Sequence, residues 1–294
     1  MNLSFVSYLA LGLWLLLTSS SFVVSEALVP YASPVASTGL RFILAGAILF
    51  PFVAKGLTTI SVELLLRYAA ISGCLVLFFL GLFKSLETTT AARTSVIYTL
   101  LPLLTVAVSS IALRAKPMAI SVLGFVLGSL GAVWVLLTLN TAAVDWGRWY
   151  FGDSLFFLSC VCLSIHVVLI KRWLTHQPPM QSTLMILLMG SLLMSPILLT
   201  QGELDQVQWQ YQEFWVAFLY LTCCTTLGTF LLQQYLLKRF SPNHLLAVSY
   251  LTPLCILLPG AWLDGFRLYY GLPGVVLTLV AMPLIFRTPP ASAR

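Results

Sequence analysis

Charged residues are scarce in this sequence. Only 15 Lys and Arg and 9 Asp and Glu occur among its 294 residues, so 8% of the chain is charged, whereas soluble domains average about 25%. Hydrophobic residues make up 60% of the chain, and the mean hydropathy is +0.98. This composition excludes soluble enzymes, DNA-binding modules and disordered scaffolds. We conclude that the sequence encodes an integral membrane protein.

Several patterns that carry catalysis or bind cofactors are also missing. The sequence contains no Gly-rich loop ending in Gly-Lys-Ser/Thr, so ATP is not expected to drive the protein directly. It also contains no HxxxH, DDxxD or Gly-x-Ser-x-Gly cluster, which argues against an intramembrane hydrolase or transferase. The six cysteines lie in apolar stretches, and Cys160 and Cys162 are too close in sequence to share a helix face. We therefore expect no enzymatic activity, no cofactor and no metal site.

Ten apolar stretches remain when charges, prolines and glycine clusters are taken as boundaries. Each has about the 20 residues that a transmembrane helix needs, and the loops left over are too short for a soluble domain. The first stretch has no basic residue before it and exceeds the apolar core of about 7–15 residues typical of a signal peptide. We interpret it as a span, with cleavage near Ser25–Ala27 as the alternative. The predicted all-α fold has spans at residues 5–25, 34–54, 63–83, 90–112, 118–138, 152–171, 180–200, 212–237, 243–262 and 270–286.

The few charges indicate an orientation. With the N-terminus in the cytoplasm, the cytoplasmic loops carry a single acid, Glu63, beside the basic residues Lys55, Arg67, Arg114, Lys116, Lys171, Arg172, Lys238, Arg239, Arg287 and Arg294. The opposite side carries most acids but only the basic residues Lys84, Arg93, Arg148 and Arg267. Because Lys and Arg concentrate on the cytoplasmic side, both termini are predicted to be cytoplasmic. The basic residues form no stripe, so no nucleic-acid partner is expected.

An internal repeat divides the chain. The stretch KSLETTTAARTSVIYTLLP (84–102) aligns without gaps on YLLKRFSPNHLLAVSYLTP (235–253), and each copy places a proline, Pro102 or Pro253, in mid-span. The predicted halves are residues 1–140 and 152–294, joined by a linker at 141–151. Because each half has five spans, the second half enters the membrane from the opposite face. Inverted repeats of this kind suit alternating access, so the duplication predicts a transporter.

The opening residues resemble a known family. LWLLLTSSSFVVSEALVPYASPVASTGLRFILAGAILFP is similar to the start of EamA-like members of the drug/metabolite transporter superfamily, in which a Trp in the first span (here Trp14) is followed by small residues and then by Arg-Phe (here Arg41-Phe42). The segments around Pro102 and Pro253 and the stretch SLFFLSCVCLSIHVVLIKRWL resemble later parts of the same family. The resemblance implies ten spans in two repeats and transport of small metabolites.

Two departures from the family bear on the substrate. An acidic residue common after the fourth span is replaced by LRAKP (113–117), with Asp264 as a possible counterpart in the second half, and the sixth span has Ser164-Ile165-His166 where a Trp and a further aromatic are usual. The family's range of substrates covers amino acids, vitamins, choline-like cations, sugars and drugs.

Polar and aromatic residues inside the spans are the candidate lining of a substrate cavity. Arg41 either anchors its helix, with Glu26 as the nearest counter-ion, or contacts substrate, since a charge in a span needs a partner. His166 either carries a proton or binds substrate, or is a neutral histidine bonded to a neighbouring helix. Gln233 and Gln234 are neighbours in the sequence. Because adjacent helix positions lie about 100° apart, only one of these two amides is expected to face inward. The candidates are Trp14, Arg41, Ser95, Tyr98, His166, Gln233, Gln234, Tyr235, Ser249 and Tyr250, with Pro102 and Pro253 as helix-breaking residues.

The sequence thus predicts a secondary transporter of the inner (cytoplasmic) membrane that exports an amino acid or a related amphipathic solute. The alternatives are uptake of a vitamin or choline-like solute and a membrane-embedded enzyme acting on lipid. The expected partners are a small-molecule substrate and the lipid bilayer, and the chain is expected to act as a monomer or homodimer. At the outer end of the third span, Lys84 and Glu87 are three residues apart and predict an exposed ion pair.

Overall fold

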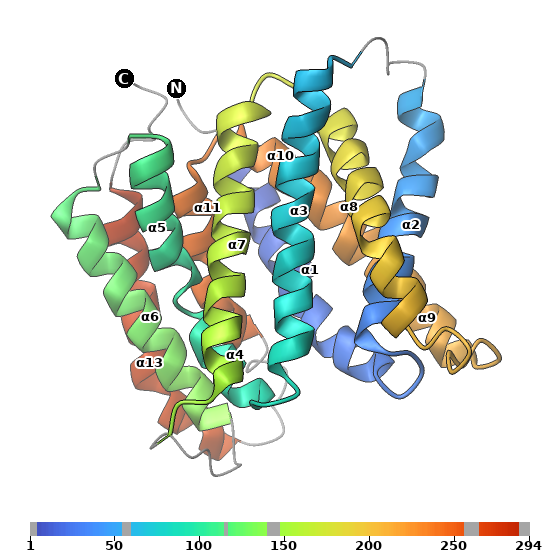
Figure 1. The fold of residues 1–294 in the computed structure, drawn as a ribbon. Helices are drawn as coiled ribbons and strands as arrows, with labels where there is room; N and C mark the ends of the chain where they lie inside the picture. The colour runs from blue at the N-terminus through green and yellow to red at the C-terminus, as the bar shows by residue number, and fades with distance from the viewer. Residues whose placement is uncertain (1–4, 55–59, 115–116, 140–147, 256–264, 288–294) are drawn as a thin grey trace.

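The computed structural model describes residues 5–54, 60–114, 117–139, 148–255 and 265–287. Throughout these residues the secondary structure is helical, without strands. The helices run up and down between two ends of the molecule. The start of the first described helix, α1 (Phe5–Leu28), and the end of the last, α13 (Gly265–Phe286), lie at the same end, which we call the termini end (Figure 1). Among the described residues, eight helical segments are long and apolar enough to cross a membrane, and Tyr270–Phe286 forms a shorter apolar helix.

Five predicted spans are found in the first half. Three are single helices, α1 (Phe5–Leu28), α2 (Pro34–Val53) and α3 (Val62–Ser85). The fourth span consists of two helices, α4 (Ala91–Tyr98) and α5 (Leu101–Ala112), and the fifth is α6 (Ala119–Leu139). Helices α2 and α3 begin close to the predicted positions because a serine caps each start. The side chains of Ser33 and Ser61 accept hydrogen bonds from Ala36 N and Leu64 N.

The second half repeats this pattern with more interruptions. It begins with α7 (Phe151–Trp173) and α8 (Pro179–Gln201). One long span follows as α9 (Gln212–Tyr220), the π-helix η2 (Leu221–Gly228) and α10 (Thr229–Leu237). The last described elements are α11 (Pro242–Ala247), the 3₁₀ turn η3 (Val248–Leu251) and α13 (Gly265–Phe286). Residues 256–262 of the ninth predicted span, Asp264 and residues 140–147, which cover most of the predicted linker, lie outside the described residues.

The aligned segments of the repeat have matching helix starts and breaks. The Thr90 side chain caps α4 by accepting from Arg93 N, and the Ser241 side chain, 151 positions later, caps α11 by accepting from His244 N. The α-helix then stops at Tyr98 in the first half and gives way to η3 in the second. Pro102 lies in the first turn of α5, where a missing N–H costs nothing. The local sequence therefore produces the same broken helix twice.

Two glycines bring α6 and α13 into close contact. A Cβ atom built on Gly131 would lie 2.7 Å from the Gly274 carbonyl oxygen, and one built on Gly274 would lie 2.6 Å from the Gly131 oxygen. Small residues allow such backbone contact between helices in a membrane, where packing replaces the hydrophobic effect. α6, the last helix of the first half, is thereby held against α13, the last described helix of the second half.

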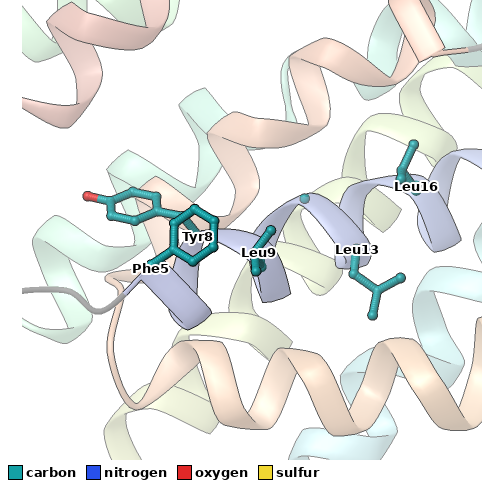
Figure 2. Close-up of a pocket in the computed structure, with 6 residues that line it drawn as sticks. Phe5, Tyr8, Leu9, Leu13 and Leu16 are labelled. Atoms are coloured by element: carbon teal, nitrogen blue, oxygen red, sulfur yellow. The ribbon is translucent and has the colours of Figure 1, made fainter.

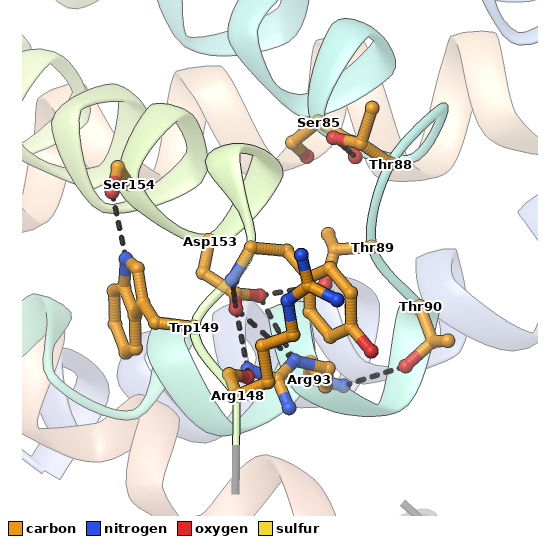
Figure 3. A network of polar contacts seen from close by, with 10 residues as sticks. Ser85, Thr88, Thr89, Thr90, Arg93, Arg148, Trp149, Asp153 and Ser154 are labelled. Carbon is orange, nitrogen blue, oxygen red and sulfur yellow. Dashed lines mark hydrogen bonds and ion pairs between the residues drawn. The ribbon is translucent and has the colours of Figure 1, made fainter. Parts of the chain in front are cut away.

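A buried ion pair joins the start of α4 to the start of α7 (Figure 3). Arg93 Nε lies 3.1 and 3.2 Å from the two Asp153 carboxylate oxygens, and a terminal guanidinium nitrogen also pairs with this carboxylate. The Asp153 carboxylate further accepts from the Thr89 hydroxyl at 2.6 Å and from Tyr150 N at 2.9 Å, while Arg93 donates to the Arg148 carbonyl oxygen at 2.9 Å. The sequence analysis treated both charges as loop charges, but their side chains are only 5% and 0% exposed.

Candidate functional site

The candidate site lies where α1 packs against η2, α10 and η3. Within η2 the helix widens to a π-turn, and the hydroxyls of Thr222 and Thr225 donate to the Phe218 and Leu221 carbonyl oxygens at 2.7 and 2.8 Å. Single π-turns inside α-helices are frequent at functional sites, because they shift the helix register and release backbone groups. η2 therefore makes this part of the α9–α10 span irregular directly opposite α1.

Eight buried side-chain N or O atoms of the described residues have no hydrogen-bond partner, and several of them belong to the elements that meet here. Within the described part of the chain, Trp14 Nε1, Thr18 Oγ1, Gln234 Nε2 and Thr252 Oγ1 are buried and have no hydrogen-bond partner. Trp14 and Thr18 belong to α1, Gln234 belongs to α10, and Thr252 directly follows η3. A buried donor without a partner costs about 1–3 kcal/mol, so each of these is a group whose hydrogen bonding a polar solute would satisfy.

The two neighbouring glutamines have different surroundings, as the helix geometry predicts. Gln234 is only 3% exposed, whereas Gln233 is partly exposed. The Tyr235 ring packs against a cation: the Arg239 guanidinium carbon lies 3.7 Å from the centre of this ring.

The candidates at the two helix breaks are held by neighbouring helices. The Tyr250 hydroxyl donates to the Phe125 carbonyl oxygen at 3.0 Å and lies 2.9 Å from Ser129 Oγ, both on α6. Ser249 donates to the Leu246 carbonyl oxygen at 2.6 Å. The Tyr98 ring packs against the Phe22 ring of α1 at 6.1 Å. Ser95 is half-buried and has interaction partners. The Tyr98 ring is thereby in contact with α1.

Arg41 and His166 lie on other helices, α2 and α7. His166 Nδ1 is 2.9 Å from the Ile71 carbonyl oxygen of α3, so this nitrogen carries the hydrogen. Arg41 is 9% exposed, and its guanidinium donates to Thr38 Oγ1 at 3.4 Å, while its Nε is buried without a hydrogen-bond partner among the described residues. The predicted pairing of Arg41 with Glu26 is wrong: Glu26 is exposed and takes part in none of the ion pairs of the described residues. The predicted pair of Lys84 and Glu87 does form, at 2.7 Å.

Thr18, Thr252 and the π-helix were not predicted. A threonine inside a helix usually bonds to the carbonyl of the preceding turn, so the sequence does not show which hydroxyls are left over. The one available signal was the run LTCCTTLG, which forms η2 and is unusually rich in threonine for an apolar span.

Comparison with known proteins assigns the family. The sequence profile of the EamA-like transporter family matches residues 6–137 and, a second time, residues 150–287. The chain belongs to the EamA-like transporter family. It is therefore a multi-pass member of a family of membrane transporters, with one profile match in each half.

Structural comparison supports the same architecture. One solved crystal structure matches this EamA-like transporter with a TM-score of 0.76 over 95% of each chain, at 18% sequence identity. At this identity the match shows a shared fold. Among curated proteins, none matches the chain.

The polar groups of the site are neutral donors within apolar surroundings. In the part of the chain that the structure describes, no group of three or more His, Cys, Asp or Glu side chains could hold a metal ion. The unpartnered atoms are an indole N–H, an amide N–H and two hydroxyls, and an apolar cluster that includes Leu11, Leu15 and Leu236 surrounds Trp14.

Proposed function

We propose that this protein is a secondary transporter that exports a small organic metabolite through alternating access of two inverted five-helix repeats, residues 1–140 and 152–294. The observation that carries the proposal is the set of unpartnered buried donors on α1, on α10 and after η3. They lie beside the π-turn and the second broken helix, where the backbone is able to change conformation. Membership of a transporter family supports the same conclusion.

The unpartnered donors favour a solute that carries a carboxylate. The Trp14 indole and the Gln234 amide nitrogen donate hydrogen bonds and accept none, so their natural partner is an acceptor. The hydroxyls of Thr18 and Thr252 both donate and accept, which suits an ammonium or a neutral polar group. Apolar side chains around Trp14 favour an amphipathic body. We therefore propose an amino acid or a related zwitterion as substrate, with export as the direction by analogy with the family.

Ser129 provides a link between the two broken helices. Its hydroxyl donates to the Thr99 carbonyl oxygen at 3.1 Å and lies 2.9 Å from the Tyr250 hydroxyl. Thr99 and Tyr250 are 151 positions apart, so they are equivalent residues of the two repeats. A conformational change at one helix break would therefore alter the contacts of Ser129 with the other break, as coupled motion of the two halves requires.

The test is transport by the purified chain in proteoliposomes. A panel of labelled amino acids, vitamins and choline-like cations is measured for counterflow, with and without a pH gradient. We expect an amino acid or a related solute to exchange unmodified. Movement of vitamins or choline-like cations alone would overturn the substrate class, and recovery of a chemically converted lipid without counterflow would favour the membrane-embedded enzyme.

A further inference from the structure

A shallow, open apolar groove of about 400 Å³, lined by residues of α1 alone, runs along one face of this helix. Figure 2 shows its lining side chains projecting from this helix. The groove begins at the termini end, and the residues that line it are Phe5, Tyr8, Leu9, Gly12, Leu13 and Leu16. All six residues are exposed at the surface of the described structure, and α1 is long and apolar enough to cross a membrane. In the bilayer this face meets hydrocarbon.

Gly12 has no packing partner that explains it. A glycine inside a helix costs about 1 kcal/mol relative to alanine, and membrane helices use glycine where another helix comes close, as Gly131 and Gly274 do. A Cβ atom built on Gly12, by contrast, would meet no heavy atom of the described chain within 4 Å. The missing side chain therefore leaves room for something outside the chain.

The groove has the length of one lipid leaflet. From Phe5 to Leu16 the helix rises about 16 Å, at about 1.5 Å per residue. The hydrocarbon core of a bilayer is about 30 Å thick, so one leaflet contributes about half of it. A single acyl chain, running from the termini end to the middle of the membrane, matches this groove.

Two cations lie where the headgroup of such a lipid would be. The Tyr8 ring packs edge-on against the Phe240 ring, with 5.8 Å between centres, and Phe240 directly follows Lys238 and Arg239. Neither cation takes part in the ion pairs of the described residues. Arg239 is held over the Tyr235 ring and donates one hydrogen bond to the Tyr235 carbonyl oxygen at 3.3 Å. Its other N–H groups remain available for a phosphate.

We propose that α1 and the Lys238–Arg239 pair form a binding site for one anionic phospholipid. One acyl chain lies along the groove over Gly12, and the lipid phosphate binds the two cations. Basic residues at the end of an apolar groove favour an anionic headgroup over a zwitterionic one, which commits the site to a lipid such as phosphatidylglycerol.

The test uses the full chain, purified in detergent, with phosphatidylglycerol and phosphatidylcholine of identical acyl chains as probes. Native mass spectrometry measures the retained lipid, and thermal unfolding measures stabilisation. We expect the wild-type protein to retain one phosphatidylglycerol in preference to phosphatidylcholine. Lys238→Gln and Arg239→Gln should each weaken this binding about fivefold, whereas Arg287→Gln, at the same end but on the segment after α13, should leave it unchanged.

Gly12→Leu tests the acyl part of the site. Because the space above Gly12 is open, the leucine should leave the fold intact and abolish retention of the bound lipid. Equal retention of the two lipids by the wild-type protein would overturn the proposal, and so would undiminished phosphatidylglycerol binding by Gly12→Leu. A change in oligomeric mass for Gly12→Leu with no change in lipid retention would assign the groove to a second copy of the chain and equally overturn it.

Discussion

At the scale of single residues, the neighbouring glutamines provide a matched pair for testing the site. Gln234→Leu removes a buried amide whose nitrogen lacks a partner, so the thermal stability should stay equal or rise. The same change removes a donor for the substrate, and a hydrogen bond to a charged group contributes about 1.5–3 kcal/mol. We therefore expect KM in the proteoliposome assay to rise at least about tenfold.

Gln233→Leu is the control for this experiment. Gln233 is only half-buried, and its replacement should leave both transport and stability close to those of the wild-type protein. Equal effects of the two substitutions on KM would remove Gln234 from the site while leaving the fold assignment untouched.

The buried pair of Arg93 and Asp153 should be the most sensitive charged position. Removing one partner of a buried pair leaves an uncompensated charge, at a cost of about 3–5 kcal/mol. We expect Asp153→Asn to lower the unfolding temperature strongly, and the Arg93→Gln/Asp153→Asn double variant to lose less than the sum of the two single variants. The exposed pair provides the comparison: Lys84→Gln should cost less than about 1 kcal/mol. Additive losses in the double variant would show that the two charges act independently.

The same pair illustrates what a sequence conceals at this scale. Arg93 and Asp153 are 60 positions apart, and each stands next to a helix start, so each was interpreted as a topology signal. The pairing depends on how α4 and α7 meet, which no local pattern encodes. The ion pair of Lys84 and Glu87 was predictable because it depends only on the helical spacing of three residues.

At the scale of helices, the contact of α6 with α13 predicts that alanine at Gly131 and alanine at Gly12 change the stability in opposite directions. Gly131→Ala places a Cβ atom within 2.7 Å of a backbone oxygen and within 2.5 Å of Thr278 Oγ1, so the helices must separate. Overpacking of this kind costs about 1–3 kcal/mol. Gly12→Ala meets no such contact and should stabilise α1 by up to about 1 kcal/mol.

Thermal unfolding in the same detergent tests both variants: the unfolding temperature should fall for Gly131→Ala and rise for Gly12→Ala. A stabilised Gly131→Ala protein would mean that α6 and α13 are further apart than the contact of their backbones indicates.

The helices themselves were largely predictable from sequence, whereas their irregularities were not. Apolar runs bounded by Ser33, Ser61 and Pro34 determine where α2 and α3 begin, and each is a local signal. The gapless alignment around Pro102 and Pro253 predicted two similar span junctions, which the matched caps Thr90 and Ser241 confirm. The π-turn η2, which packs against α1 and α2, was missed because no local sequence pattern distinguishes a π-helix from an α-helix.

At the scale of the whole molecule, the distribution of charge makes a prediction about orientation. Lys171 and Arg172 lie in the last turn of α7, and Lys238 and Arg239 directly follow α10. Both helices end at the termini end of Figure 1, while Glu203 and Asp205 lie in the loop between α8 and α9 at the other end. Because basic residues concentrate in cytoplasmic loops, the termini end should face the cytoplasm. This orientation also places the proposed lipid site in the cytoplasmic leaflet.

Cysteine labelling in intact cells checks this orientation. In a variant without the six native cysteines, Asp205→Cys should react with a membrane-impermeant maleimide from outside, because Asp205 is exposed at the end opposite the termini. His176→Cys, exposed in the α7–α8 loop, should react only after the membrane is permeabilised. The reverse pattern would place the termini outside, and the basic pair Lys238–Arg239 would then face the outer leaflet. Because the two labelling sites flank the single helix α8, they lie on opposite faces if α8 crosses the membrane, and labelling of both from the same side would contradict that span.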